Sequence, residues 1–207
     1  MKRASYLQLL GLMCSVGLLL SGCLIKPARV PTRHFVLAPI PTPEPAPAAA
    51  QPLSAEVGFV KMPAYLLRDS IVVRKSATEL KYLQDALWAE RLDQSFRQTL
   101  ANNLSSLLAS DQTHLSAPER GRVVVRVSVT VERFDVDTQG RGTLIALWRL
   151  TLPDSEKSVK SGLARLTRPG PPPLANPQAV ATTLSDLTGD LSQKLAQAIL
   201  ESVTTRP

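Results

Sequence analysis

The stretch VVVRVSVTVE, residues 123–132, alternates apolar and polar side chains over most of its length. A β-strand turns successive side chains to opposite faces, so this alternation predicts a half-buried antiparallel strand. One face would be a row of valines packed on a core, and the other would be polar and in contact with water. The apolar row is Val123, Val125, Val127, Val129 and Val131, and the polar row is Arg126, Ser128, Thr130 and Glu132.

The residues after this strand continue the sheet and end in a helix. Gly140-Arg141-Gly142 is typical of a turn, and strands are predicted over 144–152 and 158–167. The run RPGPPPLANP then interrupts the sheet pattern, and Asn176 followed by Pro177 is a preferred helix start. A long amphipathic helix is predicted from there, with an apolar stripe of Val180, Leu184, Leu187, Leu191, Leu195, Ile199 and Val203.

The residues before the valine strand follow the same plan. Strands are predicted at 34–37, 57–61, 70–75 and 79–84, the last two as a hairpin. A helix is predicted from Trp88 to Leu108, with a stripe of Trp88, Leu92, Phe96, Leu100, Leu104 and Leu107. Two runs of antiparallel strands, each followed by an amphipathic helix packed on the sheet, define an α+β fold (β-β-β-α-β-β-β-α). We expect residues 34–203 to form this single domain.

A proline-rich segment, PIPTPEPAPAAAQP, occupies residues 39–52 and contains six prolines. Such a segment cannot be helical, and its polyproline-like stiffness suits a spacer. We interpret it as a long exposed loop between two strands. The alternative is a plain linker between a membrane and the domain.

The N-terminus has the pattern of a bacterial lipoprotein signal. Lys2 and Arg3 precede an apolar run of about 15 residues, which is shorter than the roughly 20 of a spanning helix. Leu20-Ser21-Gly22-Cys23 follows directly and resembles the lipobox, in which the cysteine is acylated and the chain is cut just before it. We therefore expect a signal peptide at 1–22 and an acylated tether at 23–33. A buried cysteine in a signal anchor is the alternative.

Acylation of Cys23 would limit what cysteine can do in this protein. The chain has two cysteines, and Cys14 would leave with the signal peptide. With the Cys23 sulfur carrying lipid, an internal disulfide and a thiol-based metal or redox site are excluded. The acyl groups are the only attached groups we expect, with no cofactor and no metal. By resemblance to bacterial lipoproteins, Leu24 in place of aspartate favours the outer membrane, facing the periplasm.

The charge of the chain does not point to nucleic acid. Residues 1–22 hold two basic and no acidic residues, so removing them lowers the formal charge from +7 to +5. The basic residues are scattered, and a secreted, lipid-anchored chain seldom meets nucleic acid. A solvated basic surface explains the charge, and mild attraction to anionic lipid headgroups is the functional alternative.

No catalytic motif is present in the sequence. His34 and His114 are far apart and are expected at the surface or in loops, and no metal, nucleotide or hydrolase signature occurs. Asp135-Val136-Asp137 before Gly140 superficially resembles a calcium loop, but the required later ligands are missing. We interpret it as a polar hairpin tip. The sequence thus favours a protein that is not an enzyme.

One segment, VKMPAYLLRDSIVVRKSATELKYLQDALWAERLDQSFRQTLANNLSSLL at residues 60–108, carries a family resemblance. Its features are Pro63-Ala64-Tyr65-Leu66, Ile71-Val72-Val73, Tyr82, Trp88-Ala89-Glu90-Arg91-Leu92 and Leu100–Leu104. The segment resembles the ABC-type transport auxiliary lipoproteins (paraquat-inducible protein C-like), and the resemblance extends over about residues 33–203. The chain departs from the family in having His34-Phe35-Val36-Leu37 near the anchor and a longer proline-rich insert.

The resemblance implies a non-catalytic subunit of an MCE-type system that carries phospholipid between the inner and outer membranes. Its expected partners are an MCE-domain protein that crosses the periplasm and an inner-membrane ABC transporter, docked here at the outer membrane. A structural or assembly lipoprotein of the outer membrane or cell wall is the main alternative, and a lipid-anchored hydrolase is disfavoured. Self-association into a homo-oligomer stays open.

Four residues of that segment are the candidate partner contacts. Tyr82 and Trp88 are chosen because aromatic residues concentrate binding energy at interfaces. Tyr65 and Leu66 follow a proline in a predicted loop, where exposure is expected. The alternative for Tyr82 and Trp88 is a place in the core, because Trp88 begins an apolar stripe.

Overall fold

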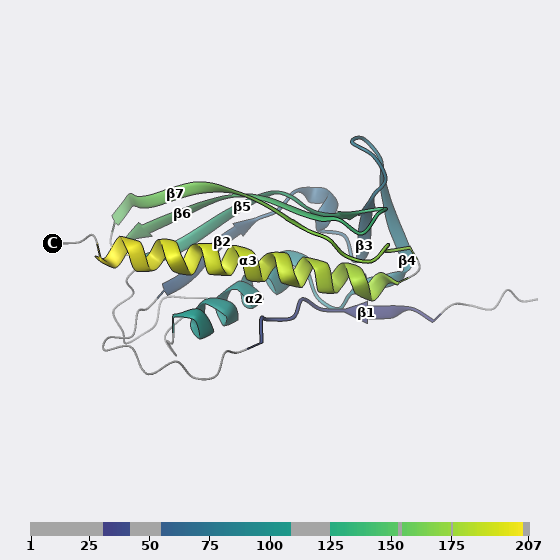
Figure 1. The fold of residues 1–207 in the computed structure, drawn as a ribbon, viewed down its shortest axis with the longest axis horizontal. Coiled ribbons are helices and arrows are strands. Elements are labelled where there is room, and N and C mark those ends of the chain that lie inside the picture. Colours follow the sequence, from purple (N-terminus) through teal and green to yellow (C-terminus); the bar gives the residue numbers. More distant parts are fainter. Residues whose placement is uncertain (1–30, 42–54, 109–124, 153–154, 175, 205–207) are drawn as a thin grey trace, which may run out of the picture. The chain divides into compact units, whose positions relative to one another are not determined.

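The computed structural model describes residues 31–41, 55–108, 125–152, 155–174 and 176–204. Residues from Thr32 onward belong to one compact unit, Thr32–Pro207. Its elements are β1 Arg33–Phe35, β2 Ala55–Lys61, the 3-10 helix η2 Ala64–Leu66, β3 Ser70–Arg74, β4 Leu80–Trp88, α2 Leu92–Leu107, β5 Val125–Asp137, β6 Gly142–Leu152, β7 Ser155–Arg168 and α3 Pro177–Thr204 (Figure 1). The predicted signal peptide, Cys23 and His114 lie outside the described residues, as do positions 42–52 of the proline-rich segment.

The strands form one open sheet in the order β1-β4-β3-β5-β6-β7. Strand β2 pairs with the first half of β5, whereas β3 pairs with the end of β5. The pairs β3–β4, β5–β6 and β6–β7 are antiparallel, whereas β1–β4, β2–β5 and β3–β5 are parallel. The predicted α+β fold is confirmed, and the sheet is mixed where the sequence predicted antiparallel pairing throughout. Parallel neighbours need a crossover, and α2 lies in the connection between β3 and β5.

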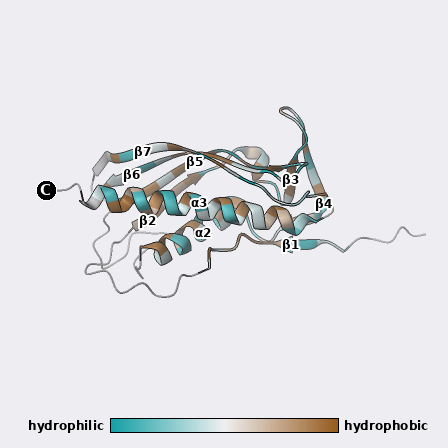
Figure 2. Ribbon diagram, viewed as in Figure 1, coloured by the Kyte–Doolittle hydropathy of each residue, from teal (hydrophilic) through white to brown (hydrophobic). Residues whose placement is uncertain are grey.

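Both helices cover one face of the sheet (Figure 1). The valines of β5 turn inward against them, and the stripe of α3 is buried along its described length. At the centre, the rings of Phe96 and Phe134 meet edge to face with centroids 5.3 Å apart. Figure 2 shows that both helices are amphipathic, because hydrophobic (brown) and hydrophilic (teal) residues alternate around each axis.

The first helix begins later than the sequence predicted. Trp88 is the last residue of β4, and α2 begins at Leu92. Trp88 is buried, with 6% of its surface exposed. It lies four residues before Leu92, so in the sequence this strand residue looked like one more turn of the helix's apolar stripe. The second helix begins at Pro177 as predicted.

A bulge in β5 determines which of its later side chains face outward. The ladder with β6 shifts register between Val131 and Arg133, so Glu132 adds a residue to β5. After the bulge, Phe134 and Val136 are buried in the core, and Arg133 and Asp135 alternate onto the face that the helices leave uncovered.

Candidate functional site

The segment between β2 and β3 folds back over the uncovered face of the sheet. Pro63 ends the strand and, with φ −58° and ψ 143°, precedes the single 3-10 turn of Ala64–Leu66. The turn is closed by a hydrogen bond from the Leu66 amide to the Pro63 carbonyl at 3.0 Å. Leu66 is buried in the core and Tyr65 is half-buried. The turn thereby fixes the Tyr65 ring beside β3 and β5.

Asp135 is the centre of the polar contacts beneath this turn. Its Oδ2 accepts hydrogen bonds from Nε and Nη2 of Arg74 at 2.9 and 2.7 Å and from the Tyr65 hydroxyl at 3.1 Å. Its Oδ1 accepts a hydrogen bond from Nε of Arg133 at 2.9 Å. The Asp135 side chain has no exposed area, whereas Arg74 and Arg133 keep 17% and 32%. A buried carboxylate is stable here because two guanidiniums and a hydroxyl satisfy both of its oxygens.

The same contacts perturb Tyr65 and Arg74. Burial raises the pKa of Tyr65 above its usual value, and the nearby negative charge of Asp135 raises it further. The hydrogen bond to Asp135 raises the pKa of Arg74. At neutral pH the phenol is therefore protonated and donates to a carboxylate, while Arg74 is positively charged.

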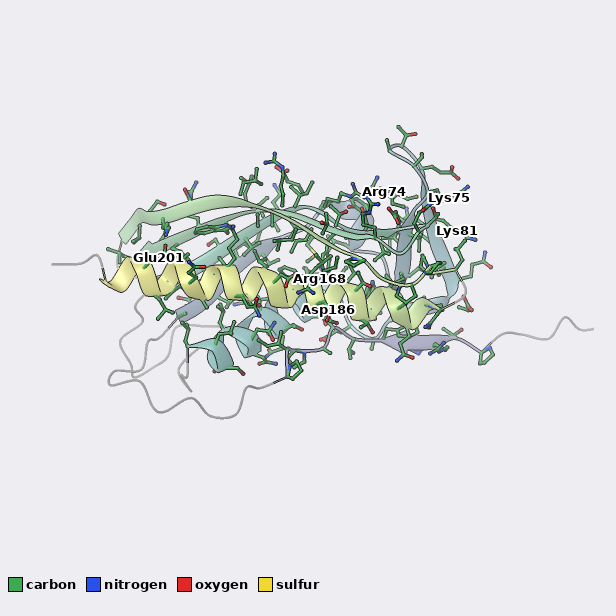
Figure 3. The ribbon with its side chains drawn as sticks, viewed as in Figure 1. Arg74, Lys75, Lys81, Arg168, Asp186 and Glu201 are labelled. Atoms are coloured by element: carbon green, nitrogen blue, oxygen red, sulfur yellow. The ribbon has the colours of Figure 1, made fainter. Side chains whose placement is uncertain are left out.

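Tyr82 and Arg68 extend this site toward solvent. The Tyr82 hydroxyl donates to the Tyr65 carbonyl at 3.2 Å, which joins β4 to the turn. The exposed Arg68 places its guanidinium 4.9 Å from the centre of the Tyr82 ring. Arg74 lies 5.7 Å from the centre of the Tyr65 ring, and Figure 3 shows Arg74 on the side of the sheet away from α3. We call Tyr65, Arg68, Arg74, Tyr82, Arg133 and Asp135 the Tyr65 cluster.

The structure separates the four predicted contact residues into two pairs. Tyr65 and Tyr82 are hydrogen-bonded neighbours at the partly exposed surface. Leu66 and Trp88 are buried at 2% and 6% exposure, so the expected exposure of Leu66 is wrong and the alternative of a core position holds for Trp88. Their partner-binding role stays a prediction, and the geometry favours Tyr65 and Tyr82.

Asp135 was missed as a site residue because the sequence indicated only a hairpin tip. That interpretation fits Asp137, whose side chain accepts from the Gln139 and Arg141 amides in the turn after β5. Asp135 differs because the bulge places it under the 3-10 turn. Arg74 was not singled out by the sequence, because its pairing with Asp135 depends on the β3–β5 contact.

A second candidate is a half-open hollow of about 500 Å³ between residues 33–41 and the first half of α3. The Ala38 amide donates a hydrogen bond to the Ser185 hydroxyl at 2.9 Å, and both residues line the hollow. His34, which borders the hollow, is exposed, as expected from the sequence. Its lining includes the polar residues Arg33, Gln178 and Asp186, but none of the four predicted contact residues borders it.

The described residues show neither a metal site nor a membrane-spanning helix. No three His, Cys, Asp or Glu side chains within the described ranges gather in a way that could hold a metal ion. In the same part of the chain, neither α2 nor α3 has the length and apolar character needed to cross a bilayer. The described residues form an α+β domain with a partly exposed cluster of aromatic rings and arginines.

Comparison with known proteins identifies the family. The chain belongs to the ABC-type transport auxiliary lipoprotein component family, whose family model matches residues 35–196. The resemblance inferred from the sequence is confirmed, and the family makes the chain a bacterial lipoprotein component of ABC-type transport.

Two solved structures share the fold. An uncharacterized protein is 21% identical, with a TM-score of 0.65 over 82% of this chain and 99% of that chain. A protein from Xanthomonas campestris is 17% identical, with a TM-score of 0.65 over 84% of this chain and 97% of that chain. A comparison with curated proteins gives no match.

Proposed function

We propose that this chain is the non-catalytic, lipid-anchored periplasmic subunit of an MCE-type ABC system that carries phospholipid between the inner and outer membranes. The observation that carries the proposal is the family match over residues 35–196. The chain would be acylated at Cys23, held at the outer membrane, and would dock the distal end of the MCE conduit. Several acyl chains on one cysteine hold a protein firmly, whereas a single chain anchors it only marginally.

The Tyr65 cluster is the surface that we assign to docking. Two of its members, Tyr65 and Tyr82, are among the residues that carry the family resemblance, and the fold brings them together. Tyrosine and arginine are enriched among the residues that dominate binding energy at protein interfaces. Leu66, the buried last residue of the turn, supports the surface from the core. A rigid aromatic surface of this kind loses little side-chain entropy on binding a partner.

The test is affinity purification of the tagged, acylated protein from crosslinked cell envelopes, followed by mass spectrometry. We expect an MCE-domain protein among the recovered partners. Arg68→Glu should abolish that recovery, because the exposed Arg68 lies over the Tyr82 ring and contributes little to the core. Lys194→Glu is the matched control, since it makes the same charge change on the exposed side of α3 and should leave recovery unchanged.

Two outcomes would overturn parts of this proposal. Repeated recovery of outer-membrane assembly or cell-wall proteins without any MCE-domain protein would favour the structural lipoprotein instead. Recovery of an MCE-domain protein that Arg68→Glu leaves intact would keep the function and remove the Tyr65 cluster from the docking surface.

A further inference from the structure

The uncovered face of β5, β6 and β7 has an ordered pattern of side chains next to the Tyr65 cluster. In the ladders, Leu147 pairs directly with Thr130 on one side and with Leu163 on the other. The flanking rows across the three strands are Arg133–Ile145–Arg165 and Ser128–Arg149–Ser161. The centre of this face is therefore a leucine pair with arginines in the rows on both sides.

Strand β2 adds two further side chains to this face. Lys61 pairs with Thr130 in the parallel ladder, so it continues the leucine row across a fourth strand. Phe59 lies two positions earlier and alternates onto the same side as Lys61. Phe59 is 69% exposed, and Leu147 and Leu163 are 45% and 37% exposed. We call Phe59, Lys61, Leu147, Arg149, Leu163 and Arg165 the basic–apolar face.

Among the described residues, the three cations of this face lack the ion pairs that some other exposed cations of the domain form. Arg91 and Arg168 form ion pairs with Asp93 and Asp190. Within the described part of the chain, Lys61, Arg149 and Arg165 form no ion pair. Glu132, exposed at the β5 bulge, is a carboxylate near these rows, and its single charge does not offset the three cations. The face therefore has net positive charge together with exposed apolar groups.

We infer that the basic–apolar face binds the anionic phospholipid headgroups of a membrane surface. Interfacial binding combines cations that attract headgroup phosphates with Phe and Leu side chains that enter the boundary with the acyl chains. The rows place the leucine pair between arginines on one open sheet surface, which allows both kinds of contact at once. This inference is independent of the MCE assignment, because it concerns a second membrane contact besides the acyl anchor.

The test uses the full acylated protein in vesicles, with one fluorescent label on the face. In this protein Cys14 is removed with the signal and Cys23 is blocked by acylation, so Leu163→Cys provides a single labelling position. Vesicles of phosphatidylcholine, with and without phosphatidylglycerol, carry nitroxide lipids that quench a label in contact with the bilayer. Gln193→Cys, on the exposed side of α3, is the control position.

We expect quenching at position 163 in the vesicles that contain phosphatidylglycerol, and its loss in neutral vesicles or at high salt. Position 193 should stay unquenched. Arg149→Glu with Arg165→Glu should abolish quenching at 163, whereas Lys81→Glu with Lys194→Glu, which changes the net charge equally on other surfaces, should not. Thermal melting of each variant checks that it is folded.

Three outcomes would overturn the inference. Quenching at 193 as strong as at 163 would mean that the anchor alone brings the domain to the bilayer without orientation. No quenching at 163 in wild-type background, which needs no charge variant, would exclude the contact. Quenching at 163 that is equally strong in neutral vesicles would show that this face does not recognise anionic headgroups. Recovery of the MCE-domain protein, measured separately through Arg68, is unaffected by any of these results.

Discussion

Arg74 and Asp135 lie 61 positions apart in the chain, and their side chains form an ion pair of 2.7 Å in which the carboxylate is completely buried. The strands that carry them share only two ladder pairs, Val73 with Val136 and Arg74 with Asp137. This short parallel ladder joins the β1-β4-β3 half of the sheet to the β5-β6-β7 half. The side-chain contacts of Asp135 therefore reinforce a joint that the backbone makes with few hydrogen bonds.

Asp135→Asn should destabilise the domain by about 2–3 kcal/mol, because it removes the charge that satisfies two guanidiniums. Both arginines keep some contact with water, which limits the loss. Urea unfolding at neutral pH measures the change. Glu79→Gln is the control, since the Lys75–Glu79 pair is exposed and its loss should cost less than about 0.5 kcal/mol. Equal costs for the two variants would contradict the importance of burial.

Tyr65 should make the stability of the domain fall at alkaline pH. Its folded-state pKa is raised, first by burial and then by Asp135, whereas the unfolded chain has the usual value near 10. The unfolded state then loses this proton before the folded state does. The stabilisation is fully present below about pH 10 and is lost as pH rises through the folded-state pKa.

Tyr65→Phe isolates this effect. The variant should be less stable by about 1–2 kcal/mol at neutral pH, because the hydrogen bond to Asp135 is gone. The difference between wild type and variant should shrink as pH rises beyond 10, because only the wild type still has the phenol at this position. Urea unfolding at a series of alkaline pH values measures it, and a difference that stays constant would refute the prediction.

Gly162 should tolerate no side chain. It pairs with Trp148 in the β6–β7 ladder, and a Cβ at 162 would lie 2.7 Å from Cζ2 of the buried indole. Gly162→Ala should therefore cost about 1–3 kcal/mol by overpacking. Gly58→Ala is the matched control, because its nearest neighbour would be Cγ of Arg126 at 3.2 Å, farther away than the indole is from position 162. Unfolding midpoints in urea compare the two.

A double-mutant cycle attributes that cost to the indole ring. The indole Nε1 of Trp148 is buried without a hydrogen-bond partner among the described residues, so Trp148→Phe removes no bond there. In the Trp148→Phe background, Gly162→Ala should cost clearly less than in wild type. An unchanged cost would place the clash elsewhere.

The fold was predictable where side-chain periodicity alone decides it. The valine alternation gave the correct buried face of β5, and the Asn176-Pro177 pair gave the correct start of α3. Local pattern says nothing of which strands become neighbours, so the parallel β2–β5 and β3–β5 pairs were not foreseen. Trp88 was assigned to the helix because a buried strand end and a helix stripe look alike over one turn.

The site was predictable only in part. Tyr65 and Tyr82 were recognised as residues of interest, yet their mutual hydrogen bond depends on the 3-10 turn folding over β4. Asp135 lay in a motif dismissed as a hairpin tip, and its burial follows from a one-residue bulge in β5. Bulges and crossovers arise from tertiary packing, so no window of sequence reports them.

Asn103 should hold the N-terminal segment of the domain against the helices. This buried side chain accepts from the Ile40 amide at 2.9 Å and donates to the Ser192 hydroxyl at 3.0 Å, linking residues 33–41, α2 and α3. Asn103→Leu keeps the branching of the side chain at Cγ but removes both bonds, so the Ile40 amide loses its acceptor. We expect a loss of about 1–3 kcal/mol in stability.

Amide hydrogen exchange at Ile40 reports the lost hydrogen bond directly. It should become faster in Asn103→Leu under native conditions. The Ala38 amide is bonded to Ser185 instead, so its exchange should change less. Asn102→Leu is the matched control on the exposed side of α2, and its stability should stay within about 0.5 kcal/mol of wild type. If Ile40 exchanges at the wild-type rate in Asn103→Leu, the segment is held by its apolar contacts, with Leu37 in the core, rather than by the Asn103 bond.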